Sequence, residues 1–390
     1  MPLKCIGIGI RQNLRYPILF MILNNIHRIL ALVIQNYING DKTFILFPAI
    51  MIISNFFFGT LFLYLRKNKN SNKELKRNDK ELIYNEITLN KFDKDCKIYI
   101  LLALDGYFEL FAFLRYLYYL KILHEEKIIY TDNKVKCREI IFASFLSYLT
   151  LRTRLYKHHK VSIQIIIIII ISNLLLDVLV QKFYGYAFTI KFTTILFQFM
   201  INICRVFSDI IEKYLFEFNY ISPYKILQLK STVELILLLF LFVFKTTREE
   251  FIFLFNMELK NIFFIIFLLL LYSIICGFLS IYKLFTVKIY STTTRSLFDS
   301  FFDILFFIYF TFSEEKRVIK VSTLYIWINI FSHIIIIFFG LVYNEFIVLY
   351  CCGMETNTYS EVYKRSEKNE YNEIRTLIIE ENTEKIDDIN

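Results

Sequence analysis

The stretch FFIIFLLLLYSIICGFLSIY, residues 263–282, decides the class of fold because it has no charged residue and no polar face. An α-helix of about 20 residues is about 30 Å long, which is the thickness of the hydrocarbon core of a bilayer. A core helix of a large soluble protein would instead carry a polar face at the helical period. The segment is therefore predicted to cross a membrane.

The rest of the chain repeats this pattern. The 390 residues are 56% hydrophobic with a mean hydropathy of +0.48, whereas soluble chains are about 45–50% apolar. The apolar residues gather in blocks of about 20, which predicts an all-α polytopic membrane protein with ten transmembrane helices. The expected spans are 14–34, 44–65, 98–122, 136–154, 161–181, 187–211, 226–245, 261–284, 294–313 and 322–349.

The polar segments define the rest of the organisation. Residues 1–13 are predicted to be a cytosolic N-terminus. The connections are short except for 66–97, which is rich in Lys, Asn, Asp and Glu and is expected to be a solvated loop. Residues 350–390 turn acidic and are expected to form a disordered cytosolic tail.

Lys and Arg in the connections indicate the orientation. With the N-terminus inside, about 20 of them fall on the cytosolic side and about 10 on the other, which predicts that both termini are cytosolic. Cations at membrane edges are explained by lipid headgroups, so the lipid bilayer is an expected partner. No basic patch is interleaved with aromatic residues, so nucleic acid is not an expected partner.

The seven cysteines show no CxxC spacing and no pairing with histidine at ligand distance. Neither a metal site nor a disulfide framework is expected, and no cofactor is predicted. No Ser/His/Asp or Cys/His arrangement stands out, so the chain is not predicted to be an enzyme.

Ionisable residues inside the spans are the candidate functional residues, because burying charge in hydrocarbon is costly. Asp105 and Glu109 lie four residues apart and share one helix face in the third span. Glu234 stands in an otherwise apolar seventh span. Arg295 and Asp299, also four apart, are expected to pair in the ninth span.

Five segments, taken in order, resemble the drug/metabolite transporter superfamily, and the fourth resembles the F subgroup of solute carrier family 35. That segment, VKIYSTTTRSLFDS, is similar to the Ser-x-Thr-Thr-Arg-x-x-x-Asp stretch of these proteins. The segments are LLALDGYFELFAFLRYLYYL (101–120), SFLSYLTLRTRLYKHHKVSIQIIIIIII (144–171), DIIEKYLFEFNYISPYKILQLKSTVELI (209–236), VKIYSTTTRSLFDS (287–300) and GLVYNEFIVL (340–349).

The resemblance implies two inverted five-helix repeats, residues 14–181 and 182–349, with a solute bound near the midplane between them. It implies a secondary transporter of a small organic solute, of the nucleotide-sugar or metabolite class, working by alternating access. An endomembrane is favoured over the plasma membrane.

The resemblance also suggests roles at the start of the ninth span. Thr293 and Thr294 would offer hydroxyls to backbone or solute, and Asp303 would face the mouth of the cavity. Arg295 would suit an anionic, phosphate-bearing solute because its planar guanidinium matches such groups. A purely structural pairing of Arg295 with Asp299 remains the alternative.

Two other classes of function stay open. A non-transporting membrane receptor or interaction protein would have a rigidly packed interior. A membrane-embedded transferase is less favoured, because the outward connections are short and lack a catalytic acid and histidine pair.

Overall fold

The computed structural model describes most of the helical part of the chain. The described residues are 6–8, 15–37, 46–74, 96–125, 138–152, 155–184, 192–241, 259–299 and 323–350, with 353–355, 358, 361 and 365 of the tail.

These residues are almost entirely helical, which confirms the all-α prediction. A further helical segment, 292–299, begins the predicted ninth span, and the rest of that span lies outside the described residues. The helices are α1 (Arg15–Tyr37), α2 (Leu46–Glu74), α4 (Cys96–Glu125), α5 (Arg138–Thr150), α6 (Lys157–Tyr184), α7 (Phe192–Phe218), α8 (Pro223–Leu241), α10 (Leu259–Ile289) and α12 (Thr323–Tyr343).

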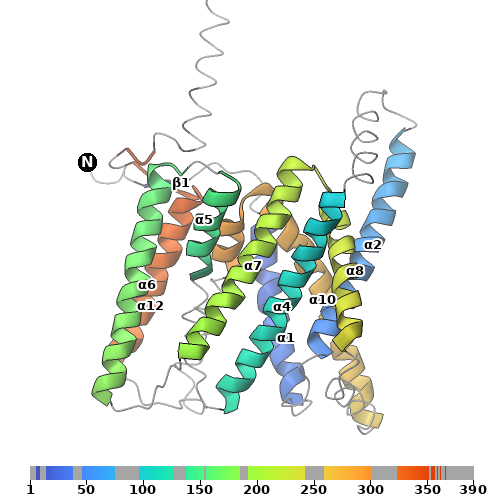
Figure 1. Cartoon of the computed structure of the whole chain (residues 1–390), viewed down its shortest axis with the longest axis horizontal. Coiled ribbons are helices and arrows are strands. Elements are labelled where there is room, and N and C mark those ends of the chain that lie inside the picture. Colours follow the sequence, from blue (N-terminus) through green and yellow to red (C-terminus); the bar gives the residue numbers. More distant parts are fainter. Residues whose placement is uncertain are drawn as a thin grey trace, which may run out of the picture.

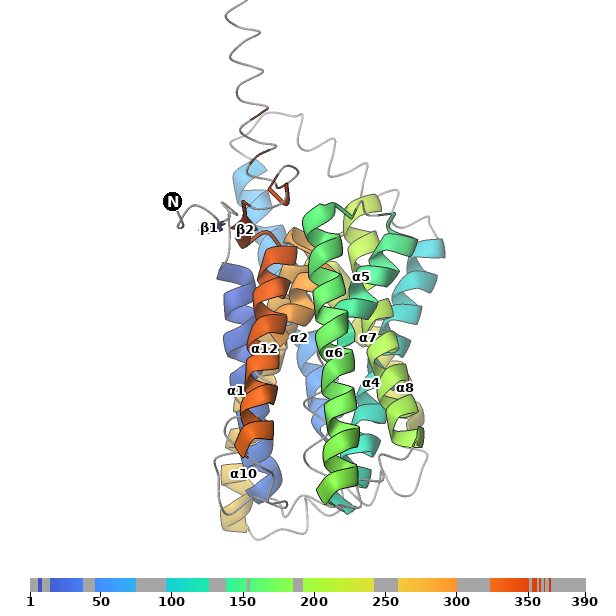
Figure 2. The same cartoon turned by 90° about the vertical axis from the view of Figure 1, so that its left-hand side faces the viewer.

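The helices form a bundle whose long members run roughly along one direction (Figures 1 and 2). Helix α4 packs on α7, α2 on α8, α1 on α10 and α6 on α12. Each of these pairs joins a helix from the first half of the chain to one from the second. The two halves are therefore interleaved and do not form separate domains.

Several helix ends differ from the predicted boundaries. Helix α2 continues to Glu74, so the polar loop begins later than residue 66. The predicted tenth span ran to 349, but α12 ends at Tyr343 and is followed by the strand β2 (Ile347–Leu349). Apolar residues continue past the end of the helix, which is why hydropathy alone could not find that end.

Strand β2 pairs with β1 (Ile6–Ile8), in the segment predicted to be a plain cytosolic terminus. The pairing is antiparallel, with Ile6 opposite Leu349 and Ile8 opposite Ile347. The two strands lie together near the label N in Figure 2. The segment after β2 also packs on the protein, because Met354 and Thr358 are buried. Of the predicted tail beyond Thr358, only residues 361 and 365 are among the described residues.

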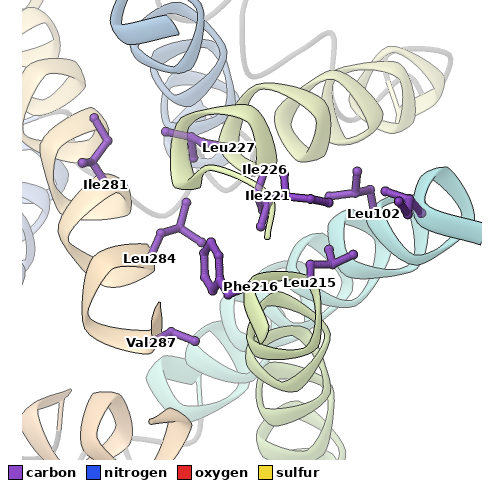
Figure 3. Close-up of a cluster of buried hydrophobic side chains, with 10 residues drawn as sticks. Leu102, Leu215, Phe216, Ile221, Ile226, Leu227, Ile281, Leu284 and Val287 are labelled. Atoms are coloured by element: carbon purple, nitrogen blue, oxygen red, sulfur yellow. The ribbon is translucent and has the colours of Figure 1, made fainter. Parts of the chain in front are cut away.

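The largest apolar cluster joins α4, α7, α8 and α10 (Figure 3). It contains Leu102, Leu215, Ile226 and Leu284, each at most 2% exposed. Burying a side chain of this size in a soluble protein contributes about 1.5–3 kcal/mol. The cluster fixes the relative positions of the four helices that also carry most of the buried charges.

Two glycines let α8 approach its neighbours closely. A Cβ at Gly59 of α2 would lie 2.9 Å from the backbone nitrogen of Gln228, and one at Gly106 of α4 would lie 3.1 Å from the carbonyl oxygen of Lys230. Small residues at helix crossings permit this approach inside membranes. Helix α8 is thus held tightly between α2 and α4.

The outside of the bundle is apolar, and its inside holds charged side chains beside the apolar clusters. Helix α1 exposes Ile18, Ile22, Ile26, Ile29 and Val33 as one stripe. Two described helices, Leu46–Arg66 and Phe263–Ile289, are long and apolar enough to cross a membrane.

Candidate functional site

The candidate site is a connected network of buried charged side chains in the middle of the bundle. Burial of so many ionisable groups is costly unless they are paired or face water. The charged side chains that are at most 8% exposed are Asp105, Glu139, Asp209, Glu212, Lys213, Lys230, Glu234, Arg295 and Asp299.

Lys230 of α8 is the centre of the first part of the network. Its ammonium lies 3.1 Å from Asp105 Oδ1 and 2.6 Å from Glu212 Oε1, and it also pairs with Glu109. The hydroxyl of Ser208 donates a hydrogen bond of 2.5 Å to Asp105 Oδ1. One lysine therefore holds carboxylates from α4 and α7 together.

Lys283 of α10 adds a second cation to the same group. Its ammonium lies 3.0 Å from Glu109 Oε1, 3.4 Å from Asp209 Oδ1 and 3.5 Å from Glu212 Oε1. We call Lys230, Lys283, Asp105, Glu109 and Glu212 the lysine cluster. Its members come from α4, α7, α8 and α10.

Arg295 of the segment 292–299 is the centre of the second part. Its Nε donates to Asp209 Oδ2 at 2.7 Å, and its Nη1 lies 3.4 Å from Glu139 Oε2 and 3.6 Å from Asp299 Oδ2. We call Arg295, Glu139, Asp209 and Asp299 the arginine cluster. Asp209 links it to the lysine cluster through Lys283.

Helix α1 reaches the arginine cluster through Asp299. The guanidinium of Arg28 lies 2.5 Å from Asp299 Oδ1, and the amide of Asn24 donates to the same oxygen at 2.6 Å. The arginine cluster therefore connects α1, α5 and α7 with the segment 292–299.

Helical spacing places these groups. Side chains three or four residues apart lie on the same helix face. Asp105 and Glu109 follow this spacing in α4, and Lys230 and Glu234 follow it in α8. Each helix thus turns two ionisable groups inward while its other faces stay apolar.

Local bonds fix the backbone beside the arginine cluster. Ser291 caps the segment 292–299, because its hydroxyl accepts a hydrogen bond of 3.1 Å from the backbone N–H of Thr294. The Thr294 hydroxyl also bonds the side chain of Asn344, just after α12. Lys213 donates to the carbonyls of Lys288 and Tyr290, each at 3.1 Å, at the end of α10.

Several carboxylate oxygens in the network have no hydrogen-bond partner among the described residues. They are Asp105 Oδ2, Asp209 Oδ1, Glu212 Oε2 and Glu234 Oε2, on side chains at most 2% exposed. Buried polar atoms are nearly always satisfied by protein, water or ligand. These oxygens therefore mark where water, a proton or a bound group is needed.

The carboxylates of Asp105, Glu109 and Glu212 converge closely enough to hold a metal ion. However, the Lys230 ammonium already contacts all three. The lysine supplies the positive charge that an ion would bring, so these residues do not make a metal site while Lys230 is in place.

The structure brings most of the predicted site residues together in the two linked clusters. Asp105, Glu109 and Glu234 lie around Lys230, and Arg295 lies beside Asp299. Thr294 is engaged by Ser291 and Asn344, and Thr293 is 1% exposed in the same segment. Asp303 lies outside the described residues.

Sequence reasoning missed three members of the network. Lys283 was counted as a cytosolic loop cation, whereas it is inside α10 and paired. Lys230, in the predicted seventh span, and Glu139, near the start of the fourth, were not singled out. The signal for Lys230 was its spacing of four from Glu234, the same spacing that singled out Asp105 and Glu109.

Fold and site together define a helical bundle with an apolar exterior and an ionic interior. Comparison of the sequence with protein-family models and with curated proteins finds no match. The resemblance to drug/metabolite transporters therefore stays a prediction.

Proposed function

We propose that the chain is a secondary transporter of a small organic solute that crosses its membrane ten times. The observation that carries this proposal is the ionic network between the two halves of the chain. Asp105, Glu109 and Glu139 come from the first half, and their cations Lys230, Lys283 and Arg295 come from the second. Buried charges in a membrane protein pair with one another or face water, and a hydrated solute pathway would account for the carboxylate oxygens that this network leaves unpartnered.

The pattern of helix neighbours supports two equivalent repeats. The five helical segments of the first half can be matched in order to the five of the second half. The matched pairs are α1 with α7, α2 with α8, α4 with α10, α5 with segment 292–299, and α6 with α12. Under this matching, several helix–helix contacts correspond to one another. The contact of α1 with α10 corresponds to that of α7 with α4, and α2 with α10 corresponds to α8 with α4. The pairs α2 with α8 and α6 with α12 correspond to themselves.

The β1–β2 pairing supports an even number of crossings, because it brings residues 6–8 and 347–349 to one end of the bundle. Ten spans with both termini on the cytosolic side agree with this pairing and with the Lys/Arg distribution. Repeats of five spans each would then be inverted relative to one another.

The solute could be an anion or a cation, and different observations favour each. The sequence resemblance favours an anion, held by Arg295. In the structure Arg295 is engaged by Asp209, Glu139 and Asp299, so an anion would have to displace a carboxylate. The unpartnered oxygens of Asp105 and Glu234 favour a positively charged group, because a carboxylate oxygen accepts a strong hydrogen bond from an ammonium.

Flux measurements in proteoliposomes test the proposal. The purified chain would be assayed with nucleotide sugars, phosphorylated metabolites and organic amines, and then as the variants Asp105→Asn, Glu234→Gln and Arg295→Gln. Glu217→Gln is the matched control, since Glu217 lies on α7 with its side chain 44% exposed. Flux should fall at least about tenfold in the site variants and stay unchanged in the control.

Unchanged flux in all three site variants would refute the site assignment. No flux with any solute class, in protein that stays monodisperse, would favour a receptor or interaction protein. Formation of product from a lipid-linked donor would instead favour a transferase.

A further inference from the structure

A second cluster of ionisable side chains lies outside the charged network, where α6 begins and α12 has just ended. His158 and His159 are in the first turn of α6, and Glu345 is in the turn between α12 and β2. One ligand atom from each of the three lies within 4.8 Å of the others. The two helices pack together and lie side by side in Figures 1 and 2, which is how these residues meet.

His158 is buried without satisfying its polar atoms. Its side chain is 2% exposed, and neither ring nitrogen has a hydrogen-bond partner in the part of the chain that the structure describes. A buried polar group left in this state is destabilising. An imidazole nitrogen with an unused lone pair is also a preferred ligand of first-row transition metals.

The separation of His158 from Glu345 fits a shared metal ion better than a hydrogen bond. His158 Nε2 lies 3.4 Å from Glu345 Oε1, and the two atoms are not oriented as a hydrogen bond. Two donor atoms that each bind Zn²⁺ at about 2.0–2.1 Å with tetrahedral geometry are themselves about 3.4 Å apart. Little movement would be needed for both to bind one ion.

The turn that ends α12 places the Glu345 carboxylate beside this cluster. Glu345 has a φ of 59°, the left-handed conformation in which helices commonly end, and the backbone N–H of Phe346 donates to the carbonyl of Leu341 at 2.9 Å across it. The carboxylate is 9% exposed, so this turn holds a largely buried carboxylate against a buried imidazole.

His159 is the third ligand and must change its bonding to bind. Its Nδ1 accepts a hydrogen bond of 3.1 Å from the backbone N–H of Tyr156, which caps the start of α6. The proton of the neutral ring is then on Nε2. Coordination through Nε2 would move that proton and release the cap, so His158 and Glu345 are the two ligands already in position.

We propose that His158, His159 and Glu345 form a site for a divalent transition metal ion. Zn²⁺ is the ion whose preference for imidazole and carboxylate ligands fits best, with water as the fourth ligand. Lys157 and Lys160 flank the histidines but are exposed, so solvent screens their charges. The ion would join the start of α6 to the end of α12.

Metal binding by the purified full chain tests the proposal. The protein would be stripped with a chelator, dialysed against Zn²⁺ and analysed for bound metal, as wild type, His158→Gln and Glu345→Gln. His333→Gln is the control, because His333 is equally buried but lies within α12, where its Nδ1 bonds a carbonyl of the same helix. We expect one zinc per chain in wild type and control, and affinity at least about tenfold lower in the two site variants.

Two further readouts keep the test decisive if a variant folds poorly. Co²⁺ bound to the wild type should show the strong visible absorption of a four-coordinate ion, and Zn²⁺ should raise the melting temperature of wild type and His333→Gln only. Zinc bound equally by all forms, no zinc retained by the wild type, or the weak spectrum of hydrated cobalt would each overturn the proposal.

Discussion

Removing the Lys230 ammonium tests the central claim that the network is held together by a few cations. Lys230 contacts Asp105, Glu109 and Glu212, while Lys283 also contacts the last two. Of these three carboxylates, Lys230→Met should therefore leave Asp105 without a cation, with its hydrogen bond from Ser208. Leaving one buried charge uncompensated costs about 3–5 kcal/mol.

The same reasoning predicts that Asp105→Asn restores part of the stability lost in Lys230→Met. Asp105→Asn keeps the size of the side chain and removes the charge that Lys230→Met exposes. The double variant should recover about half or more of the lost stability, because no unpaired carboxylate is left at that position. Asp105→Asn alone should cost less than Lys230→Met, since Lys230 keeps Glu109 and Glu212.

The assay is reversible unfolding in mixed micelles at increasing SDS, followed by circular dichroism. Lys160→Met is the control, because Lys160 is an exposed lysine of α6 and should stay within about 0.5 kcal/mol of wild type. The reasoning fails if Lys230→Met is as stable as this control. It fails equally if the losses of the two single variants simply add in the double variant.

Three further predictions follow from particular contacts. Gly59→Ala should destabilise the bundle by about 1–3 kcal/mol, because its Cβ would press on the Gln228 backbone; SDS unfolding would show this. Ser291→Ala should cost about 1 kcal/mol through loss of a helix cap, and Ser291→Thr should keep most of it in the same assay. Arg28→Gln should lower the melting temperature less in an Asp299→Asn background than alone, and equal shifts in both backgrounds would contradict the pairing.

The positions of the helices could be predicted from the sequence, because blocks of about 20 apolar residues are a strong local signal. Each described helix overlaps a predicted span, and so do the six residues of the ninth span, 294–299, that the structure describes. The ends could not be predicted, because apolar residues continue past Tyr343 into β2. The pairing of β1 with β2 was also out of reach, since two strands of three residues from opposite ends of the chain carry no joint signal.

The acids of the site could be predicted and their partners could not. Asp105 and Glu109 stand out because carboxylates inside an apolar block are costly anywhere in it. A lysine near the end of an apolar block is ambiguous, because it normally reaches the membrane surface. Only the packing of α10 on α7 and α8, which brings Lys283 to Glu109 and Asp209, decides that this lysine turns inward. The meeting of His158 with Glu345 likewise depends on the docking of α6 on α12.

The short sheet joins the two ends of the described helical part of the chain. Because Ile6–Ile8 is hydrogen-bonded to Ile347–Leu349, the chain before α1 and the chain after α12 are held together. Any motion that separates α1 from α12 at that end must either break these hydrogen bonds or move both strands together. A two-stranded sheet is marginally stable on its own, so in the proposed transporter this pairing is a contact that can break and re-form as the helices move.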